Sequence, residues 1–224
     1  ELITRSFTSE NAIHWECNGA GEYEIESCTR DIHGTDVIMH ISDEESEYLN
    51  DAKIKDILEK YCSFMSVDIY FDSDSNEDED KSEKAQATPV NNTSPLWLKQ
   101  ASDCSDEEYK EFYQKVFRDF KEPLFHIHIN ADYPLNFKGI LYFPRLGNEY
   151  ESIEGQVKLY YNQVFVADNI KEVIPEYLLM LKGVLDCPEL PLNVSRSYLQ
   201  NNTYVSKVSA HIVKKVCDKL NSLC

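Results

Sequence analysis

The sequence predicts an α+β (or α/β) fold in which helices cover a mixed β-sheet. Segments such as LFHIHINAD (residues 124–132) alternate apolar and polar side chains, which is typical of strands. Other segments repeat apolar residues at helical spacing, and the two kinds of segment follow one another along the chain. With 224 residues, of which 42% are hydrophobic, the chain is long enough for one or two domains with cores of their own.

The first 71 residues predict a small group of strands followed by a helix. HWECNGAGEYEIESC (14–28) has a Gly-Ala-Gly turn between two strand-like runs, and GTDVIMHI (34–41) alternates as a strand does. SDEESEYLNDAKIKDILEKYCSFM (42–65) carries one apolar stripe at helical spacing, and acidic residues crowd its start. VDIYF (67–71) predicts a short strand.

The composition then changes at residues 72–94, which hold no large apolar residue except Val90. Such a stretch cannot offset its ordering entropy, so we expect an acidic flexible linker between two domains, 1–71 and 95–224. Acidic and amide residues here also fall at the ligand positions of an EF-hand loop. They are Asp72, Asp74, Asn76, Asp78, Asp80 and Glu83. Position 6, which needs Gly, is Glu77, so a solvated linker is favoured over a calcium site.

Residues 95–224 predict two amphipathic helices, a third helix and several strands. SDEEYKEFYQKVFRDF (105–120) begins at a capping Ser105 and presents an apolar face that ends at Phe120. FKGILYFP (137–144) and QVKLYYNQVFVAD (156–168) predict strands, the latter a pair divided near Tyr161 and Asn162. IPEYLLMLKGVLDC (174–187) predicts an apolar helix. VSKVSAHIVKKVCDKLNSL (205–223) predicts a helix with the apolar stripe Val205, Val208, Ile212, Val216 and Leu220.

The composition argues against several classes of function. Forty acidic against 22 basic residues give a net charge of −18, which argues against nucleic-acid binding. No run of 18 apolar residues predicts a membrane span. The seven cysteines are scattered and odd in number, which suggests reduced thiols and a cytoplasmic protein. Because the chain starts at Glu1 rather than Met, we expect a piece of a longer protein.

Motifs of self-contained catalysis are absent: there is no GxSxG, HExxH, Walker A or GxGxxG pattern. His126 and His128 lie two apart on one strand, as two zinc ligands would. The sequence offers no further ligands for them, so a polar strand face or an interface is the favoured interpretation.

The loop LPLNVSRSYLQ (190–200) raises a question of its own. If a helix starts at Ser195, Arg196 and Gln200 project from one face, where they could bind a phosphate and position a water. A cation in the first helical turn is electrostatically unfavourable. When the spacing alone is considered, the favoured alternative is that Arg196 binds loop carbonyls or a nearby carboxylate.

The run DCPELPLNVSRSYLQNN (186–202) resembles the catalytic loop of the heat-shock protein 90 (Hsp90) family, a family of ATP-dependent stress-response chaperones. SDEEYKEFYQ, GILYFP, QVKLYYNQVFVAD, HWECNGAGEYEI and GTDVIMHI resemble further family motifs in the same order. The resemblance covers nearly the whole chain outside residues 72–94 and is greatest to bacterial members.

The resemblance implies the tail of a gyrase/histidine-kinase-type ATPase domain at 1–71. It implies the first subdomain of an αβα middle domain (ribosomal S5 domain 2-like) at 95–224. Arg196 then matches the arginine that reaches the ATP γ-phosphate, Gln200 and Asn193 match its loop neighbours, and Thr35 matches a threonine that helps hold the adenine. Two positions depart from the family pattern: Ser197 replaces a Glu, and Tyr161-Asn162 replaces a pair often containing Arg.

The resemblance further implies ATP with Mg²⁺ as cofactor in the full-length protein. The partners it implies are unfolded client proteins and a second copy bound through a C-terminal domain outside this chain. Since the main ATP-site motifs are not in these residues, we expect the fragment alone to be an inactive ATPase. The alternative is a non-catalytic client-binding module with an exposed surface at Trp97, Phe120 and Tyr150.

Overall fold

The computed structural model describes residues 1–72, 88–145, 155–168, 173–178, 180–190 and 203–223. These residues form two compact units, Glu1–Ile54 and Lys55–Cys224. The predicted linker falls mostly outside the described residues, so the division into domains at 72–94 stays a prediction.

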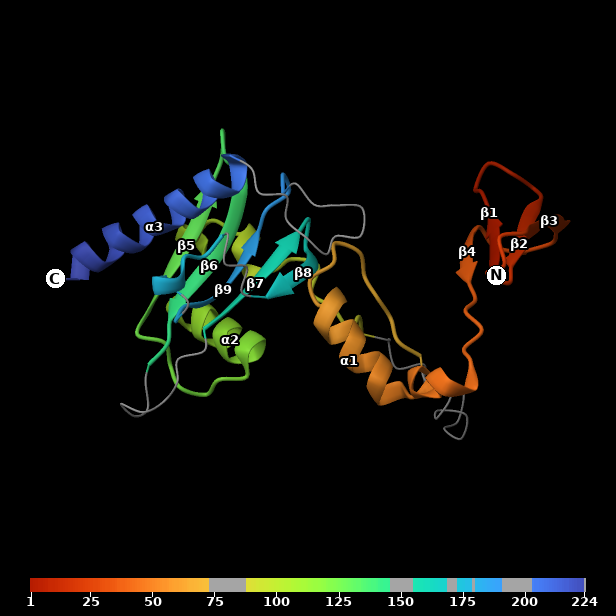
Figure 1. The fold of residues 1–224 in the computed structure, drawn as a ribbon, viewed down its shortest axis with the longest axis horizontal. Coiled ribbons are helices and arrows are strands. Elements are labelled where there is room, and N and C mark those ends of the chain that lie inside the picture. The colour runs from red at the N-terminus through yellow and green to blue at the C-terminus, as the bar shows by residue number, and fades with distance from the viewer. Residues whose placement is uncertain (73–87, 146–154, 169–172, 179, 191–202, 224) are drawn as a thin grey trace. The chain divides into compact units, whose positions relative to one another are not determined.

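The first unit is built on a four-stranded antiparallel sheet with the order β3-β2-β1-β4 (Figure 1). Its strands are β1 (Leu2–Arg5), β2 (Ala12–Cys17), β3 (Tyr23–Cys28) and β4 (Gly34–Val37). The predicted hairpin is confirmed: β2 pairs with β3, and the turn places Gly19 and Gly21 at positive φ. The interior strand β1, which pairs with β2 and β4, was not predicted, because LITR is too short to show a pattern.

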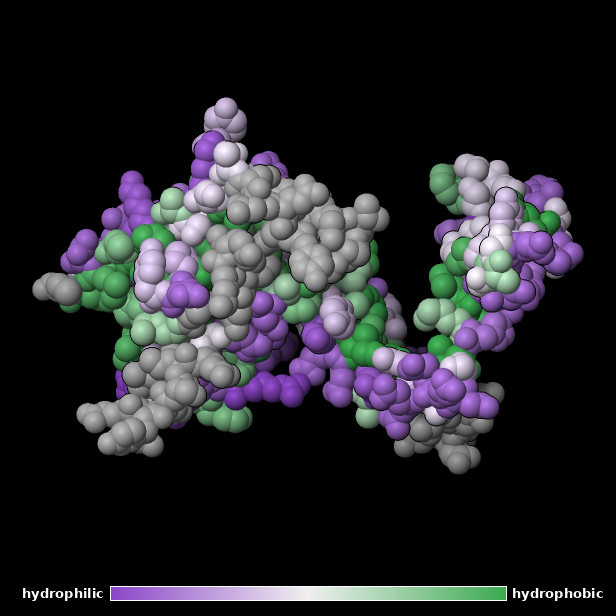
Figure 2. All heavy atoms as spheres, viewed as in Figure 1, coloured by the Kyte–Doolittle hydropathy of each residue, from purple (hydrophilic) through white to green (hydrophobic). Residues whose placement is uncertain are grey.

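The sheet of the first unit buries little apolar surface. Among residues 1–54, all of which the structure describes, Ala12 is the one hydrophobic residue that is buried. Large apolar side chains are exposed instead, among them Phe7, Tyr23, Ile25 and Met39. Figure 2 accordingly shows hydrophobic atoms among hydrophilic ones at the surface of this unit.

The predicted helix at 42–65 is confirmed but divided in two. A 3-10 helix, η1 (Asp43–Leu49), is followed by α1 (Asp51–Cys62), and Asn50 between them has extended backbone angles. The Asn50 side chain accepts a hydrogen bond from Ala52 N at 2.9 Å, so it starts the second helix as a cap. The division between the two units falls inside α1.

The predicted strand at 67–71 is wrong. The side chain of Asn91 takes the hydrogen bonds that a neighbouring strand would otherwise make. Its Nδ2 donates to Met65 O and Val67 O, both at 2.8 Å, and its Oδ1 accepts from Ile69 N at 2.8 Å. Val90 N also donates to Ile69 O at 2.8 Å. One amide side chain therefore holds this segment without a regular ladder.

The second unit contains a five-stranded mixed sheet with the order β5-β6-β9-β7-β8. Its strands are β5 (Phe125–Ala131), β6 (Phe137–Phe143), β7 (Gln156–Tyr161), β8 (Val164–Asp168) and β9 (Lys182–Asp186). All neighbours are antiparallel except β7 and β9, which are parallel. The predicted strands at 124–132, 137–144 and 156–168 are confirmed, and so is the division of the last near Tyr161.

Helices lie on both faces of this sheet (Figure 1). On one face, α2 (Asp106–Phe117) and the short helix η3 (Leu96–Leu98) pack an aromatic cluster against Ile140, Tyr142 and Val184. On the other face, α3 (Thr203–Leu223) packs against side chains such as Leu141 and Leu185. The predicted α+β class, with helices covering a mixed sheet, is confirmed. Short 3-10 turns, η4 (Ala101–Asp103) and η5 (Glu176–Leu178), complete the described elements.

The two predicted amphipathic helices are present with small differences. Ser105 caps α2 in a capping box: its side chain accepts from Glu108 N, and the Glu108 carboxylate accepts from Ser105 N. The helix ends at Phe117, before Phe120, whose side chain is 89% exposed and not part of the buried face. In α3 the predicted stripe is buried except for Leu220 near its end, which is exposed.

The predicted helix at 174–187 is wrong: in its first half the described residues form only the 3-10 turn η5, and its second half is a strand. Residues 182–186 form β9, the central strand, which pairs with β6 on one side and β7 on the other. Because both faces of this strand are covered by helices, its apolar run is continuous and does not alternate. A run of that kind has the same appearance in sequence as a buried helix.

Candidate functional site

The residues Asn193, Arg196 and Gln200 lie outside the described residues, so the structure does not test their predicted roles. It does describe the chain on both sides of them, up to Leu190 and again from Thr203. The hydrogen bonds and packing of these flanking residues show how the chain on each side of the loop is joined to the fold.

On the first side, the loop follows β9, whose last residue is the buried Asp186, 5% exposed. Its Oδ2 accepts from Trp97 Nε1 at 3.3 Å and from Gln163 N at 3.0 Å. Burial raises the pKa of Asp186, and the hydrogen bond from Trp97 opposes that rise. Within the described part of the chain, Oδ1 has no hydrogen-bond partner.

The donors to Asp186 come from two other elements. Gln163 belongs to the turn between β7 and β8, where Asn162 and Gln163 both have positive φ, as a tight hairpin turn of this kind requires. Trp97 comes from η3 and is fully buried. This corrects the alternative hypothesis of a client surface at Trp97, because the indole packs into the aromatic cluster instead. Tyr150, the third residue of that surface, lies outside the described residues.

The next residues continue this attachment. Cys187 N donates to Tyr160 O at 3.0 Å, and Leu190 N donates to Cys187 O at 3.3 Å. The Cys187 side chain is fully buried, and burial raises the pKa of its thiol. Its sulfur is therefore held as a neutral, packed thiol.

On the second side, Tyr204 holds the start of α3 against the turn between β5 and β6. Its hydroxyl donates to Leu135 O at 2.6 Å, and burial raises its pKa. Val205 and Val208, which follow, are buried in the core under α3. Both sides of the predicted catalytic loop are thus joined to the rigid sheet.

Thr35, the predicted adenine contact, belongs to the first unit. It lies on β4 opposite Thr4 of β1, and the two hydroxyl oxygens are 2.8 Å apart. The Thr35 side chain is exposed. A hydroxyl in this position keeps a free lone pair or proton for a ligand.

His126 and His128 contact an aromatic side chain of α2. The His126 ring stacks on Tyr109 with the centroids 3.7 Å apart, and His128 Nδ1 lies 2.7 Å from the Tyr109 hydroxyl. Burial lowers the pKa of both histidines, which favours their neutral forms. Across the described ranges, no three His, Cys, Asp or Glu side chains gather as metal ligands would.

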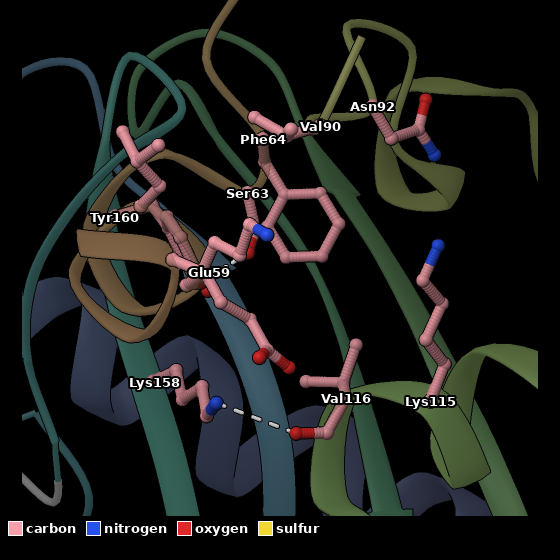
Figure 3. Close-up of a pocket in the computed structure, with 11 residues that line it drawn as sticks. Glu59, Ser63, Phe64, Val90, Asn92, Lys115, Val116, Lys158 and Tyr160 are labelled. Atoms are coloured by element: carbon pink, nitrogen blue, oxygen red, sulfur yellow. Dashed lines mark hydrogen bonds between the residues drawn. The ribbon is translucent and has the colours of Figure 1, made fainter. Parts of the chain in front are cut away.

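A pocket of about 280 Å³ in the second unit was not predicted (Figure 3). Its basic side chains are Lys55, Lys115 and Lys158, and its apolar ones include Phe64, Val116 and Tyr160. They come from α1, α2, β7 and the segment around Val90, four parts of the chain that are far apart in sequence. No local motif could therefore have indicated it.

A family model described as Hsp90 protein matches residues 72–224. The chain belongs to the Hsp90 family. Curated relatives agree over the full chain, including the part before residue 72.

Three of these Hsp90 relatives, each called chaperone protein HtpG, illustrate the range of similarity. The one from Porphyromonas gingivalis is 45% identical over 228 residues, which span 100% of this chain and 33% of the relative. The one from Bacteroides thetaiotaomicron is 43% identical, also over 100% of the chain and 33% of the relative. The one from Sulfurimonas denitrificans is 36% identical over 98% of the chain and 37% of the relative. The chain thus spans about a third of the length of these relatives.

Among the helices the structure describes, none is long and apolar enough to cross a membrane. The six cysteines within the described residues have free thiols.

Proposed function

We propose that this chain is the central part of an ATP-dependent Hsp90-family chaperone and that it supplies Arg196 to the γ-phosphate of ATP. The observation that carries the proposal is the attachment of both sides of the arginine loop. Asp186 accepts hydrogen bonds from η3 and from the β7–β8 turn, and Tyr204 donates one to the turn between β5 and β6. A loop held at both ends can present a guanidinium in a reproducible position, as phosphoryl transfer requires.

Each predicted site residue then has a chemical role. The Arg196 guanidinium would neutralise the charge that develops on the γ-phosphate. Gln200 would orient the attacking water, and Asn193 would fix the loop backbone. Thr35 would bind the adenine through its exposed hydroxyl.

The described residues fit part of the ATP–Mg²⁺ group. Thr35 offers one suitable hydroxyl, and within the described chain no three His, Cys, Asp or Glu side chains gather as metal ligands. The nucleotide would supply the scissile phosphate bond, and residues outside this chain would supply most of its binding site. We therefore propose that ATP hydrolysis belongs to the full-length protein.

The test is the substitution Arg196→Ala in the full-length protein. Turnover should fall by about 10³-fold or more, the usual contribution of an arginine in phosphoryl transfer, while ATP affinity changes little. Phosphate release and equilibrium nucleotide binding measure the two quantities. Arg145→Ala, at an exposed arginine after β6, is the matched control and should leave both unchanged. Normal turnover in Arg196→Ala would remove the catalytic role.

A second candidate function is client binding without a catalytic part, and one observation favours it. Several apolar side chains of the second unit are largely exposed, among them Phe120, Leu124 and Tyr133. Exposed apolar groups of this kind suit an unfolded polypeptide. The Arg196→Ala variant separates the two functions. If the chain only binds clients, the ATP turnover of the full-length protein should not change when Arg196 is replaced. We also propose that the full-length protein forms a homodimer in the cytoplasm.

A further inference from the structure

The pocket under α1 combines cationic and apolar walls in a way that the catalytic proposal does not use. Lys115 lies on α2 and Lys158 on β7, and both line it together with Lys55 of α1. Leu58, Phe64 and Tyr160 supply apolar wall. In Figure 3 the Lys115 side chain points toward Asn92, whereas the Lys158 ammonium group points toward the backbone oxygen of Val116.

The pocket is a local positive region in a chain whose net charge is −18. Its one acidic side chain, Glu59, is already paired, because Arg118 Nη2 lies 2.7 Å from Glu59 Oε1. Within the described ranges, none of the three lysines forms an ion pair with a carboxylate. Lys55 Nζ lies over the Phe71 ring, 5.1 Å from its centroid. An anion that enters the pocket therefore meets ammonium groups that are not held in salt bridges by the described part of the chain.

Lys158 is the most constrained of these ammonium groups. It is half-buried, and its Nζ donates to Val116 O at 3.3 Å, as the dashed line in Figure 3 marks. An ammonium has three protons to donate, so this contact leaves donors to spare. Burial lowers the pKa of Lys158, which means that the charged form lacks solvation that a ligand could replace.

The size and walls of the pocket limit what can enter. A volume of about 280 Å³ is at the lower end for ligand sites, which suits one compact group and not a nucleotide. The aromatic and aliphatic walls favour an apolar body, and the lysines favour a negative charge at one end of it.

We propose that this pocket binds a carboxylate carried on a compact apolar group, with the half-buried ammonium group of Lys158 facing the carboxylate. The chemistry is that of a small aromatic acid or of a polypeptide chain that ends in an aromatic residue. The lining residues of this pocket do not include the described residues that flank the arginine loop, and failure of this proposal would leave the catalytic proposal intact.

The test uses the full chain and three small probes, followed by NMR chemical-shift titration. N-acetylphenylalanine carries both charge and apolar body and should bind with a dissociation constant of about 1 mM or tighter, as expected for so small a ligand. N-acetylphenylalaninamide has the same body without the charge, and acetate has the charge without the body. Both should bind at least about tenfold more weakly. Equal binding of the acid and the amide would overturn the proposal.

Variants connect the binding to the pocket. Lys158→Met should weaken binding of N-acetylphenylalanine about tenfold, because the charge-assisted contact is lost. Lys110→Met is the matched control, since Lys110 pairs with Glu122 at 3.1 Å and does not line this pocket. Lys115→Ala should weaken binding less than Lys158→Met, because the exposed Lys115 contributes only to the local positive charge. Equal effects of Lys110→Met and Lys158→Met would show non-specific attraction and overturn the assignment.

Two peptides identify the source of the carboxylate. An octapeptide that ends in Phe with a free carboxylate is compared with the same peptide amidated at its C-terminus. If the free-acid peptide binds at least as well as N-acetylphenylalanine, polypeptide ends are ligands of the pocket. If it binds more weakly, small aromatic acids are.

Discussion

Asp186 is the residue on which three distant parts of the second unit converge. Its buried carboxylate accepts hydrogen bonds from an indole of η3 and from the backbone of the β7–β8 turn, and the arginine loop follows it directly. A buried carboxylate with one unpartnered oxygen in the described structure is energetically unfavourable in its charged form. Burial therefore raises the pKa of Asp186.

The raised pKa of Asp186 has a consequence for stability. The folded chain binds a proton there more tightly than the unfolded chain, so this carboxylate lowers the free energy of unfolding as the pH rises from the ordinary Asp pKa to the raised one. Asp186→Asn cannot titrate and should lack this fall. The difference in melting temperature between the two proteins, followed from about pH 4 to about pH 7, measures this loss of stability. Parallel curves over that range would contradict it.

At the scale of elements, β9 explains both the architecture and the main error of the sequence interpretation. It lies at the centre of the sheet and has close backbone neighbours on the β6 side. A Cβ added at Gly183 would come within 2.6 Å of Ile140 O and 2.7 Å of Leu141 Cδ2. The glycine is therefore required by the approach of two strands.

The effect of Gly183→Ala on stability tests whether this segment is the strand β9 or the helix that the sequence predicted. In an exposed helix, Ala would stabilise the chain by roughly 1 kcal/mol relative to Gly. In β9, the added methyl group meets backbone and should destabilise the fold by about 1–3 kcal/mol. Denaturant unfolding of the two proteins measures the sign. A stabilised variant would contradict the position of β9.

The elements that the sequence predicted correctly are those with one apolar side and one polar side. Strands such as β5 alternate, α2 carries its cap at Ser105, and α3 shows a clear stripe, because one side of each faces the core. The segment at 67–71 was misread because a single side chain, Asn91, replaces a strand partner, which no period reveals. The pocket around Lys158 was missed because its residues meet only in the folded chain.

At the scale of the whole molecule, the two compact units differ in how much apolar surface they bury. The second unit contains two extensive clusters, one on each face of its sheet. In the first unit, Ala12 is the one buried hydrophobic residue among residues 1–54. Buried apolar area is the main source of stability, so the units should differ in local stability.

Hydrogen exchange tests this difference directly. Amides of β1–β4 should exchange faster than those of β6 and β9, because opening the first sheet exposes little buried surface. Mass spectrometry of exchanging peptides from the full chain gives both rates in one experiment. Equal protection of the two sheets would show that the first unit gains stability from contacts other than its own core.

The hydrogen bond from Val90 N to Ile69 O, together with those of the Asn91 amide, fastens the two ends of the acidic stretch to one another. Loop-closure entropy rises only with the logarithm of length, about 0.6 kcal/mol for each doubling. Residues can thus be added to or removed from this stretch at small thermodynamic cost, while Ile69 and Val90 stay together. A change in the number of residues between Ile69 and Val90 should therefore leave these hydrogen bonds in place.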